Sequence, residues 1–412
     1  MGIDPKDKRI IQELAKRVAE IAALPQQQET IRLWKALNGL KPVRPMVTID
    51  QVCWHEMDVD GELAFQTADP FCQKLETRLR RTLYQWKHFP VDMVVEPHIN
   101  IAKTIRGAGF GLERQEKTAA LDPANDVVGH YYYDQLPNEE DVEKIQIPQI
   151  RLDAEATARD EQQAHEIFDG ILEVRMQGLL PNFAPWDQLV QWRGVETVLA
   201  DLAMWPEYMH RLISRLTDAH LALHDQLEAQ GLYGYGQSLI HCTGAHTDEL
   251  PAPGFDPRKP RARDLWIFGM AQIFSSVSPA MHEEYELQYA HRIYERFGLV
   301  YYGCCEPLDD RIDILASIPH LRKISMSPWV NVERGAAGIG PRYVFSRKPS
   351  PAFLARDTFS PEAVEKDLRE TAAACARHGC PLEFILKDIS TVRYEPRRLW
   401  QWADIAMQVI GA

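Results

Sequence analysis

The sequence predicts an α/β protein, and three observations favour a (β/α)8 TIM barrel. The chain has 412 residues, which is enough for one barrel with insertions. From residue 278 onward, short apolar segments alternate with segments of helical pattern, as expected for parallel strands covered by helices. Polar residues follow these apolar segments, and a barrel gathers the carboxyl ends of its strands on the face that holds the active site.

An open, doubly wound sheet is the main alternative, because it also places its site at the carboxyl ends of the strands. Such sheets commonly carry a G-x-G-x-x-G loop after an early strand. We find no such loop after an early strand here. The pattern therefore favours the barrel.

The first forty residues predict an N-terminal helical extension. Apolar residues recur at helical spacing up to Pro25, and a second helical stretch runs from Glu29 to Gly39. We accordingly divide the chain into a helical extension at 1–40 and a barrel at 41–412.

The first part of the barrel region has short strands and long irregular segments. "PMVTID" at 45–50 and "VDMVVEP" at 91–97 predict buried strands with a helix between them. The acidic segment 134–163 and the proline-rich segment 247–264 predict insertions, and a long helix is expected over 206–230.

The second part of the barrel region is regular. Ser278 and the proline after it predict the start of a helix that runs to Gly298. The strands expected after it are "LVYYG", "KISMS", "YVFSR" and "LEFILKD", with helices at 308–317, after Ser360 and after Glu395 and a helical turn at 331–338.

The charge and the apolar segments exclude several classes of partner. The formal net charge is −13, so a polyanion such as nucleic acid would be repelled. The longest apolar stretch, around "LWIFGMAQIF", is too short to cross a membrane, and the start of the chain lacks a signal-peptide core. We therefore expect a cytoplasmic protein without nucleic-acid or membrane partners, and we leave its oligomeric state open.

Two adjacent cysteines, Cys304 and Cys305, follow the predicted strand "LVYYG", and Glu306 comes next. The seven cysteines of the chain are odd in number and scattered, so they predict no disulfide framework. A free thiol is mostly protonated at neutral pH, and zinc would make it anionic. We expect one of the two sulfurs to bind zinc; the alternative is that both are small buried residues that end a strand.

Several other residues are candidates for chemistry. His55 and His98 each follow a predicted strand and, with Glu306, are candidates for proton transfer; the alternative is a hydrogen-bonded surface histidine. "HCTGAH" at 241–246 is rich in metal-binding residue types, but its spacing matches no standard zinc motif, so a solvated turn is favoured over a metal site. Lys387 and Asp388 follow the last predicted strand and offer a cation and a carboxylate, or a simple ion pair.

Substrate contacts are expected from aromatic, amide and cationic residues near the strand ends. Most Trp and Tyr residues only fill the core, so this interpretation depends on their position after strands. The candidates are Trp54, Gln272, Tyr302, Trp329, Arg347 and Lys387.

The segments 263–329, "RDLWIFGMAQIF…" to "…KISMSPW", and 382–400, "LEFILKDISTVRYEPRRLW", resemble the uroporphyrinogen decarboxylase and cobalamin-independent methionine synthase superfamily. The resemblance covers roughly residues 180–410. Within the superfamily, the chain is most similar to the decarboxylase-like branch found near corrinoid methyltransferase systems. The resemblance implies a (β/α)8 barrel.

Methyltransferases of this superfamily bind catalytic zinc through a His-x-Cys pair after one strand and a Cys after a later strand. Here Cys304 and Cys305 stand at the first position without the histidine, and Asp388 stands near the second. The resemblance thus implies zinc with Cys304, Cys305 and Asp388 as ligands. The arginine-rich motif of the true decarboxylases is missing from residues 40–60, which disfavours porphyrinogen decarboxylation.

Taken together, these features predict a methyltransferase that moves a methyl group between a small methylated compound and a corrinoid protein. Zinc would act as a Lewis acid on the heteroatom that loses or gains the methyl group. A metal-independent decarboxylase or lyase is the first alternative, with Lys387, Arg347 and Lys348 binding a carboxylate. A non-catalytic barrel that binds a ligand or docks a corrinoid protein is the second.

Overall fold

The computed structural model describes residues 3–120, 122–125 and 127–411 and has an α/β fold. Its centre is a seven-stranded sheet with the order β1-β15-β14-β13-β12-β11-β8, in which every neighbouring pair is parallel. The strands are β1 Met46–Ile49, β8 Asn182–Phe183, β11 Trp266–Gly269, β12 Leu299–Tyr302, β13 Leu321–Met326, β14 Val344–Arg347 and β15 Leu382–Leu386. The α/β class predicted from the sequence is confirmed.

The connectivity has the features of a barrel, although closure is not shown. Strands β11 to β15 are neighbours in chain order, and β15 then pairs with β1, with Thr48 opposite Ile385. First and last strands therefore lie side by side. Among the described residues no ladder joins β1 to β8, so closure into an eight-stranded barrel stays a prediction.

A second parallel pair, β2 (His98–Ala102) with β7 (Glu173–Gln177), is separate from the central sheet. The remaining strands form short antiparallel pairs: β3 Ile105–Arg106 with β6 Arg151–Leu152, β4 Glu116–Ala119 with β5 Gly129–Tyr132, and β9 Leu239–Ile240 with β10 Thr243–Gly244.

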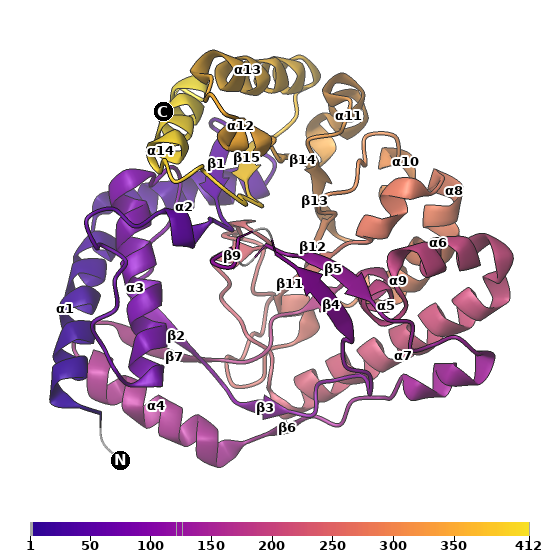
Figure 1. Cartoon of the computed structure of the whole chain (residues 1–412), viewed down its shortest axis with the longest axis horizontal. Coiled ribbons are helices and arrows are strands. Elements are labelled where there is room, and N and C mark those ends of the chain that lie inside the picture. The colour runs from indigo at the N-terminus through magenta and orange to yellow at the C-terminus, as the bar shows by residue number, and fades with distance from the viewer. Residues whose placement is uncertain (1–2, 121, 126, 412) are drawn as a thin grey trace.

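The helices lie around the outside of the strands (Figure 1). They are α1 Pro5–Ala22, α2 Pro25–Asn38, α3 Pro70–His88, α4 Ala154–Phe168, α5 Pro185–Arg193, α6 Val195–Met204, α7 Pro206–Gln230, α8 Pro279–His282, α9 Gln288–Tyr294, α10 Ile312–Leu315, α11 Val332–Ile339, α12 Ala352–Ala355, α13 Pro361–His378 and α14 Arg397–Val409. A π-helix, η5 Glu283–Leu287, joins α8 to α9, and short 3-10 helices include η1 Trp54–Glu56, η2 Glu139–Lys144, η3 Ala262–Asp264, η4 Gln272–Ser276 and η6 Gly340–Arg342.

Helix starts and core packing follow directly from the sequence. The side chains of Asp69 and Ser360 accept hydrogen bonds from amides of the first turns of α3 and α13, each of which begins with proline. The largest apolar cluster joins strand residues such as Phe384 to the inner faces of α13 and α14. A separate cluster packs α1, α3 and α4 around β2. Among the described residues, no helix has the length and apolar character needed to cross a membrane.

Several predicted elements are confirmed and three are corrected. The strand at 45–50 and the helix over 206–230 are present, as is the alternating pattern after residue 278. The segment 91–97 is not a strand: its Asp92 amide bonds to the Val47 carbonyl and its Val95 amide to the Gln27 side chain, so it joins no ladder.

The other two corrections concern helices. The segment 134–163, predicted to be irregular, contains the first part of α4, which starts at Ala154 after a capping Asp153. The helix predicted at 308–317 is only the single turn α10. Strands β2 to β11 were not predicted, because most of their segments are short or lack alternation.

Candidate active site

Four neighbouring parallel strands place polar side chains on one edge of the sheet. Cys304 follows β12, Ser325 lies near the end of β13, Lys348 follows β14 and Lys387 follows β15. The carboxyl ends of parallel strands meet at the same edge, as predicted from the sequence. We call His241, Cys304, Cys305, Lys387 and Asp388 the thiol cluster.

The sulfur of Cys304 is the centre of the thiol cluster. The Nζ atom of Lys387 and the Nε2 atom of His241 each lie 3.2 Å from it. The Cys305 sulfur lies 3.5 Å from the Cys304 sulfur and 3.6 Å from Oδ2 of Asp388. That carboxylate in turn lies 3.0 Å from Nζ of Lys387. One buried sulfur therefore contacts a thiol, an imidazole and an ammonium group.

These contacts favour a thiolate at Cys304. The hydrogen bond from Cys305 lowers the pKa of the Cys304 thiol, and His241 and the charge of Lys348 lower this pKa further. The same hydrogen bond, together with burial, raises the pKa of Cys305. Burial opposes the charge on Lys387, but the negative charges of Cys304 and Asp388 raise its pKa overall. These directions favour an ammonium–thiolate pair with a protonated thiol beside it.

Side chains of the two neighbouring strands β13 and β14 hold the turn that carries Cys304. The Oγ atom of Ser325 donates to the Cys304 carbonyl at 2.7 Å, and Nζ of Lys348 donates to it at 3.0 Å. Gly303 has φ +95°, in the left-handed region, and a Cβ there would lie 2.4 Å from the Leu308 side chain. Glycine is therefore required where the chain turns from β12 toward the thiols.

Glu306 holds the same turn from the other side. It is 1% exposed; Oε2 accepts from the Cys304 amide at 2.8 Å, and Oε1 accepts from the Ala271 amide at 3.3 Å. Burial, with the charge of Cys304, raises the pKa of this carboxyl. Glu306 thus ties the thiol turn to the end of β11, so its contacts are those of a positioning residue.

Backbone strain is concentrated around the thiol cluster. His241 (φ 38°), Cys242 (φ 71°) and Asp388 (φ 55°) adopt positive φ angles, which are uncommon for residues other than glycine. Each such residue costs of order 1–3 kcal/mol and persists only where the surroundings enforce it. Strain of this kind gathers at functional sites, so it supports a functional role for this edge of the sheet.

A buried polar layer lies below the thiol cluster. Lys323 of β13 and Glu383 of β15 form an ion pair of 2.9 Å with both side chains fully buried. Thr243 donates to the same carboxylate at 2.6 Å. Because alternate strand residues share a face, Glu383 and Lys387 lie on one side of β15, with Ile385 between them. The positive charge of Lys323 is balanced by Glu383, so this layer adds no net charge beneath the thiol cluster.

The structure brings five of the predicted site residues together, and the other predicted residues lie outside this group. Cys304, Cys305, Glu306, Lys387 and Asp388 gather as described. Tyr302 is fully buried on the other face of β12, where its hydroxyl lies 2.6 Å from Nε2 of His282. It does not line the site.

Arg347 also points away from the thiols. Its guanidinium donates to the Ser327 carbonyl at 2.6 Å and lies 3.4 Å from the Asp367 carboxylate of α13. The neighbouring Lys348 faces the thiol turn instead. The carboxylate site expected for a decarboxylase from Arg347, Lys348 and Lys387 is therefore not formed.

The predicted histidines lie outside the thiol cluster. Nε2 of His55 lies 3.6 Å from Glu56, whose carboxylate accepts hydrogen bonds from the Val392 and Tyr394 amides in the loop after Asp388. His98 is the first residue of β2 rather than the residue after a strand. It lines a cavity described below.

The remaining predicted contacts are dispersed. Trp54 packs edge-on against Tyr84 and lies under the guanidinium of Arg81. Trp329 is 76% exposed. Gln272 donates to Asp187 at 3.0 Å; burial and the charge of Glu306 raise the pKa of that carboxyl to about 7. Of these three, Gln272 is the one linked to the site, through Asp187.

The residues present do not fit a zinc ion in this arrangement. Among the residues that the structure describes, no group of three or more His, Cys, Asp or Glu side chains is arranged to hold a metal. Imidazole, thiolate and carboxylate are suitable zinc donors. However, the ammonium group of Lys387 contacts both Cys304 and Asp388 and already supplies the positive charge there. Zinc at Cys304, Cys305 and Asp388 stays a prediction.

Sequence reasoning left one member of the cluster undecided. His241 belongs to the "HCTGAH" segment, for which the sequence favours a solvated turn over a metal-binding site. In the structure its ring stacks on Phe268 with centroids 3.7 Å apart, and this contact directs Nε2 at Cys304. The one sequence feature that pointed to His241 as a site residue was its position next to Cys242 in this short segment.

Comparisons with known proteins add little to this geometry. No family profile and no curated protein matches the chain. One solved structure that it resembles is a methyltransferase from Methanosarcina mazei, with 12% sequence identity and a TM-score of 0.49, over 92% of this chain and 96% of that one. At this level of likeness we infer neither fold nor activity from it.

Proposed function

We propose that the chain is a methyltransferase that moves a methyl group between a small methylated compound and a corrinoid protein, on a closed barrel of the uroporphyrinogen decarboxylase type. The observation that supports it best is the contact of the Cys304 sulfur with Lys387 and His241, both at 3.2 Å. A thiolate is a strong nucleophile toward carbon. A buried cationic partner keeps it ionised at neutral pH.

The proposed chemistry is a displacement at the methyl carbon. The Cys304 sulfur attacks that carbon, a sulfur–carbon bond forms, and the bond from carbon to its heteroatom breaks with the electron pair on the heteroatom. The methyl group then passes to the reduced corrinoid, and the sulfur recovers its electron pair. No step in this scheme requires zinc.

The surrounding residues have distinct roles in this proposal. Lys387 stabilises the thiolate before attack and after methyl release. Glu306 and Ser325 fix the turn so that the sulfur keeps its direction. Cys304 itself is only 3% exposed, so substrate cannot reach it directly from bulk solvent. We propose that substrate approaches from the side of Asp388, whose side chain is 48% exposed.

Methyl transfer to reduced free cobalamin tests the proposal, with methanol, methylamines and methylated thiols as donors. We expect Cys304→Ser to lower the rate with the accepted donor by at least about a hundredfold. Without an acceptor, the wild-type protein should gain the mass of one methyl group on Cys304. The matched control is Cys72→Ser, at a buried thiol of α3 whose pKa burial raises to about 12. Full activity of Cys304→Ser would contradict the proposal.

A further inference from the structure

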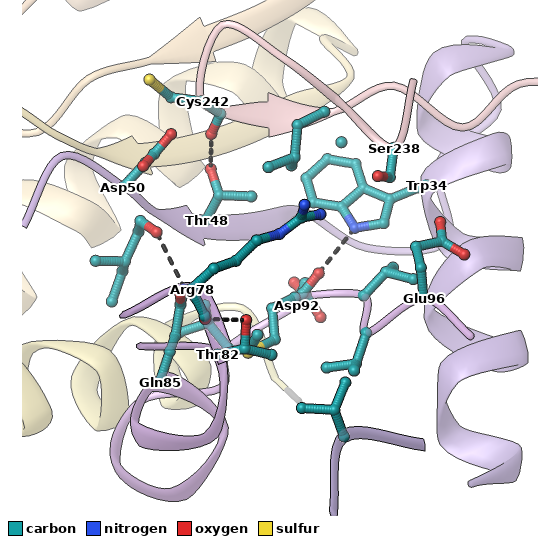
Figure 2. Close-up of a pocket in the computed structure, with 18 of the residues that line it drawn as sticks. Trp34, Thr48, Asp50, Arg78, Thr82, Gln85, Asp92, Glu96, Ser238 and Cys242 are labelled. Atoms are coloured by element: carbon teal, nitrogen blue, oxygen red, sulfur yellow. Dashed lines mark hydrogen bonds between the residues drawn. The ribbon is translucent and has the colours of Figure 1, made fainter. Parts of the chain in front are cut away.

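A cavity of about 260 Å³ lies next to the thiol cluster, between the end of β1 and helix α3 (Figure 2). Asp50 and Cys242 form part of its wall. The Asp50 amide donates to the Leu386 carbonyl at 3.0 Å, and Lys387 of the thiol cluster is the next residue. The cavity and the thiol cluster are therefore separated by one strand end.

The side chain of Arg78, on α3, extends across this cavity toward Trp34 (Figure 2). One of its terminal nitrogens donates to the Asn100 carbonyl at 2.9 Å. A guanidinium has five N–H donors, so most of its capacity remains. Among the described residues, no carboxylate forms an ion pair with Arg78, and it is the one Lys or Arg among the described residues that line the cavity.

The surroundings of Arg78 make this charge unusual. Its side chain is exposed, yet desolvation by the surrounding protein lowers the pKa of its guanidinium. Both observations hold if the exposed surface faces the cavity rather than bulk water. The guanidinium is then accessible to an opposite charge that enters the cavity.

Other polar groups of the wall are already used to hold it. The indole nitrogen of Trp34 donates to the Asp92 carbonyl at 2.9 Å. Thr48 donates to the Cys242 carbonyl at 2.8 Å, and Gln85 donates to the Ile49 carbonyl at 3.2 Å. The guanidinium of Arg78 is thus the strong donor left to meet a ligand.

The remaining titratable groups around the cavity favour a ligand with a single negative charge. Asp92 is held by Arg44 at 2.6 Å, and burial raises the pKa of Glu96. Burial lowers the pKa of His98 to about 4, so its imidazole is neutral. Asp50 has no ion pair among the described residues; it accepts a hydrogen bond from the Gln51 amide and one from the Cys242 thiol. One negative charge on a ligand is balanced by Arg78, whereas the second charge of a dianion such as phosphate meets no further Lys or Arg among the described lining residues.

We infer that this cavity binds a small monocarboxylate through a paired hydrogen bond from Arg78. The planar fork of a guanidinium matches the two oxygens of a carboxylate. A volume of about 260 Å³ is below the usual range for drug-sized ligands, so the ligand is a small organic acid. This binding does not depend on the proposed methyl transfer.

Ligand-observed NMR with sodium propionate at constant ionic strength tests the inference. We expect wild-type protein to bind propionate at least about tenfold more tightly than propionamide, which has the same shape without the charge. Arg78→Gln should lose at least about tenfold in propionate affinity. The matched control is Arg369→Gln, at an exposed arginine of α13 that pairs with Glu365 on its own helix.

Three outcomes would overturn the inference: equal binding of propionate and propionamide, unchanged propionate binding by Arg78→Gln, or tighter binding of inorganic phosphate than of propionate. The comparison of propionate with propionamide uses wild-type protein, so it holds even if a variant folds poorly. Cys304→Ser should keep wild-type propionate affinity. Failure of methyl transfer is therefore distinguishable from failure of carboxylate binding.

Discussion

The Nζ atom of Lys387 lies 3.2 Å from the Sγ atom of Cys304, although 83 residues separate them in the chain. Each side chain follows a strand of the same parallel sheet, and the two strands are β12 and β15. The contact exists because the carboxyl ends of the strands share an edge. An ammonium group at this distance favours the thiolate form of the cysteine, together with Cys305, His241 and Lys348.

Replacing Lys387 with methionine should raise the pKa of Cys304, because the thiolate loses its nearest cation. In the methyl-transfer assay, the acid limb of the pH–rate profile should move to higher pH. Lys387→Arg keeps the charge and should shift the limb less. An unchanged profile in Lys387→Met would show that the ammonium group does not control ionisation.

The raised pKa of Asp187 should make the free energy of unfolding depend on pH. Burial and the charge of Glu306 raise its pKa to about 7 in the folded protein, against about 3.9 when unfolded. The folded state therefore binds more protons between these values, and stability from this group is lost as the pH rises from about 4 to about 7.

Relative to Asp187→Asn, the free energy of unfolding of the wild type should fall with rising pH, by at most about 1.4 kcal/mol per pH unit in this window. Urea unfolding of both proteins at several pH values measures the difference. A difference that stays constant, or that grows in favour of the wild type, would contradict the raised pKa.

Because Lys323 and Glu383 form a buried ion pair, substitutions of the two residues should affect the free energy of unfolding non-additively. Lys323→Met leaves a buried carboxylate without its cation and should cost about 3–5 kcal/mol. The double variant Lys323→Met with Glu383→Gln should cost less than the two single changes added together. Denaturant unfolding of the three variants measures this, and simple additivity would argue against the pair.

Zinc content distinguishes a Cys304 thiolate paired with Lys387 from a Cys304 thiolate that binds zinc. A lysine-paired thiolate predicts less than one zinc per chain in protein purified without chelator. Elemental analysis of the wild type, Cys304→Ser and Cys305→Ser measures it. One zinc per chain, lost in Cys304→Ser, would instead support the ligand set Cys304, Cys305 and Asp388 expected from the resemblance, and would require Lys387 to release the sulfur.

All four strands from β12 onward could be predicted, because continuous apolar runs and Ser-Pro helix starts are local features. The meeting of Cys304, Lys387 and Asp388 also followed from the sequence, since it needs only the common direction of parallel strands. Closure of the sheet is different, because it depends on pairings that no local pattern encodes.

The side to which a strand residue points was the main limit. Arg347 was expected in the site and Lys348 lies there instead, because a shift of one residue exchanges the two faces of a strand. Tyr302 was misplaced for the same reason. Arg78 could not be recognised at all: in the sequence it is an ordinary polar residue of a helix, and only the tertiary fold places a cavity around it.

The ionisation of Cys304 tests the lysine-stabilised thiolate most directly, and the ultraviolet absorbance of the thiolate measures this ionisation. We predict that a pH titration of the wild type minus that of Cys304→Ser shows one thiolate already present at about pH 7, with a midpoint well below the ordinary thiol pKa of about 8.5. A difference that appears only at or above that ordinary pKa would contradict the lysine-stabilised thiolate and the methyl-transfer chemistry built on it.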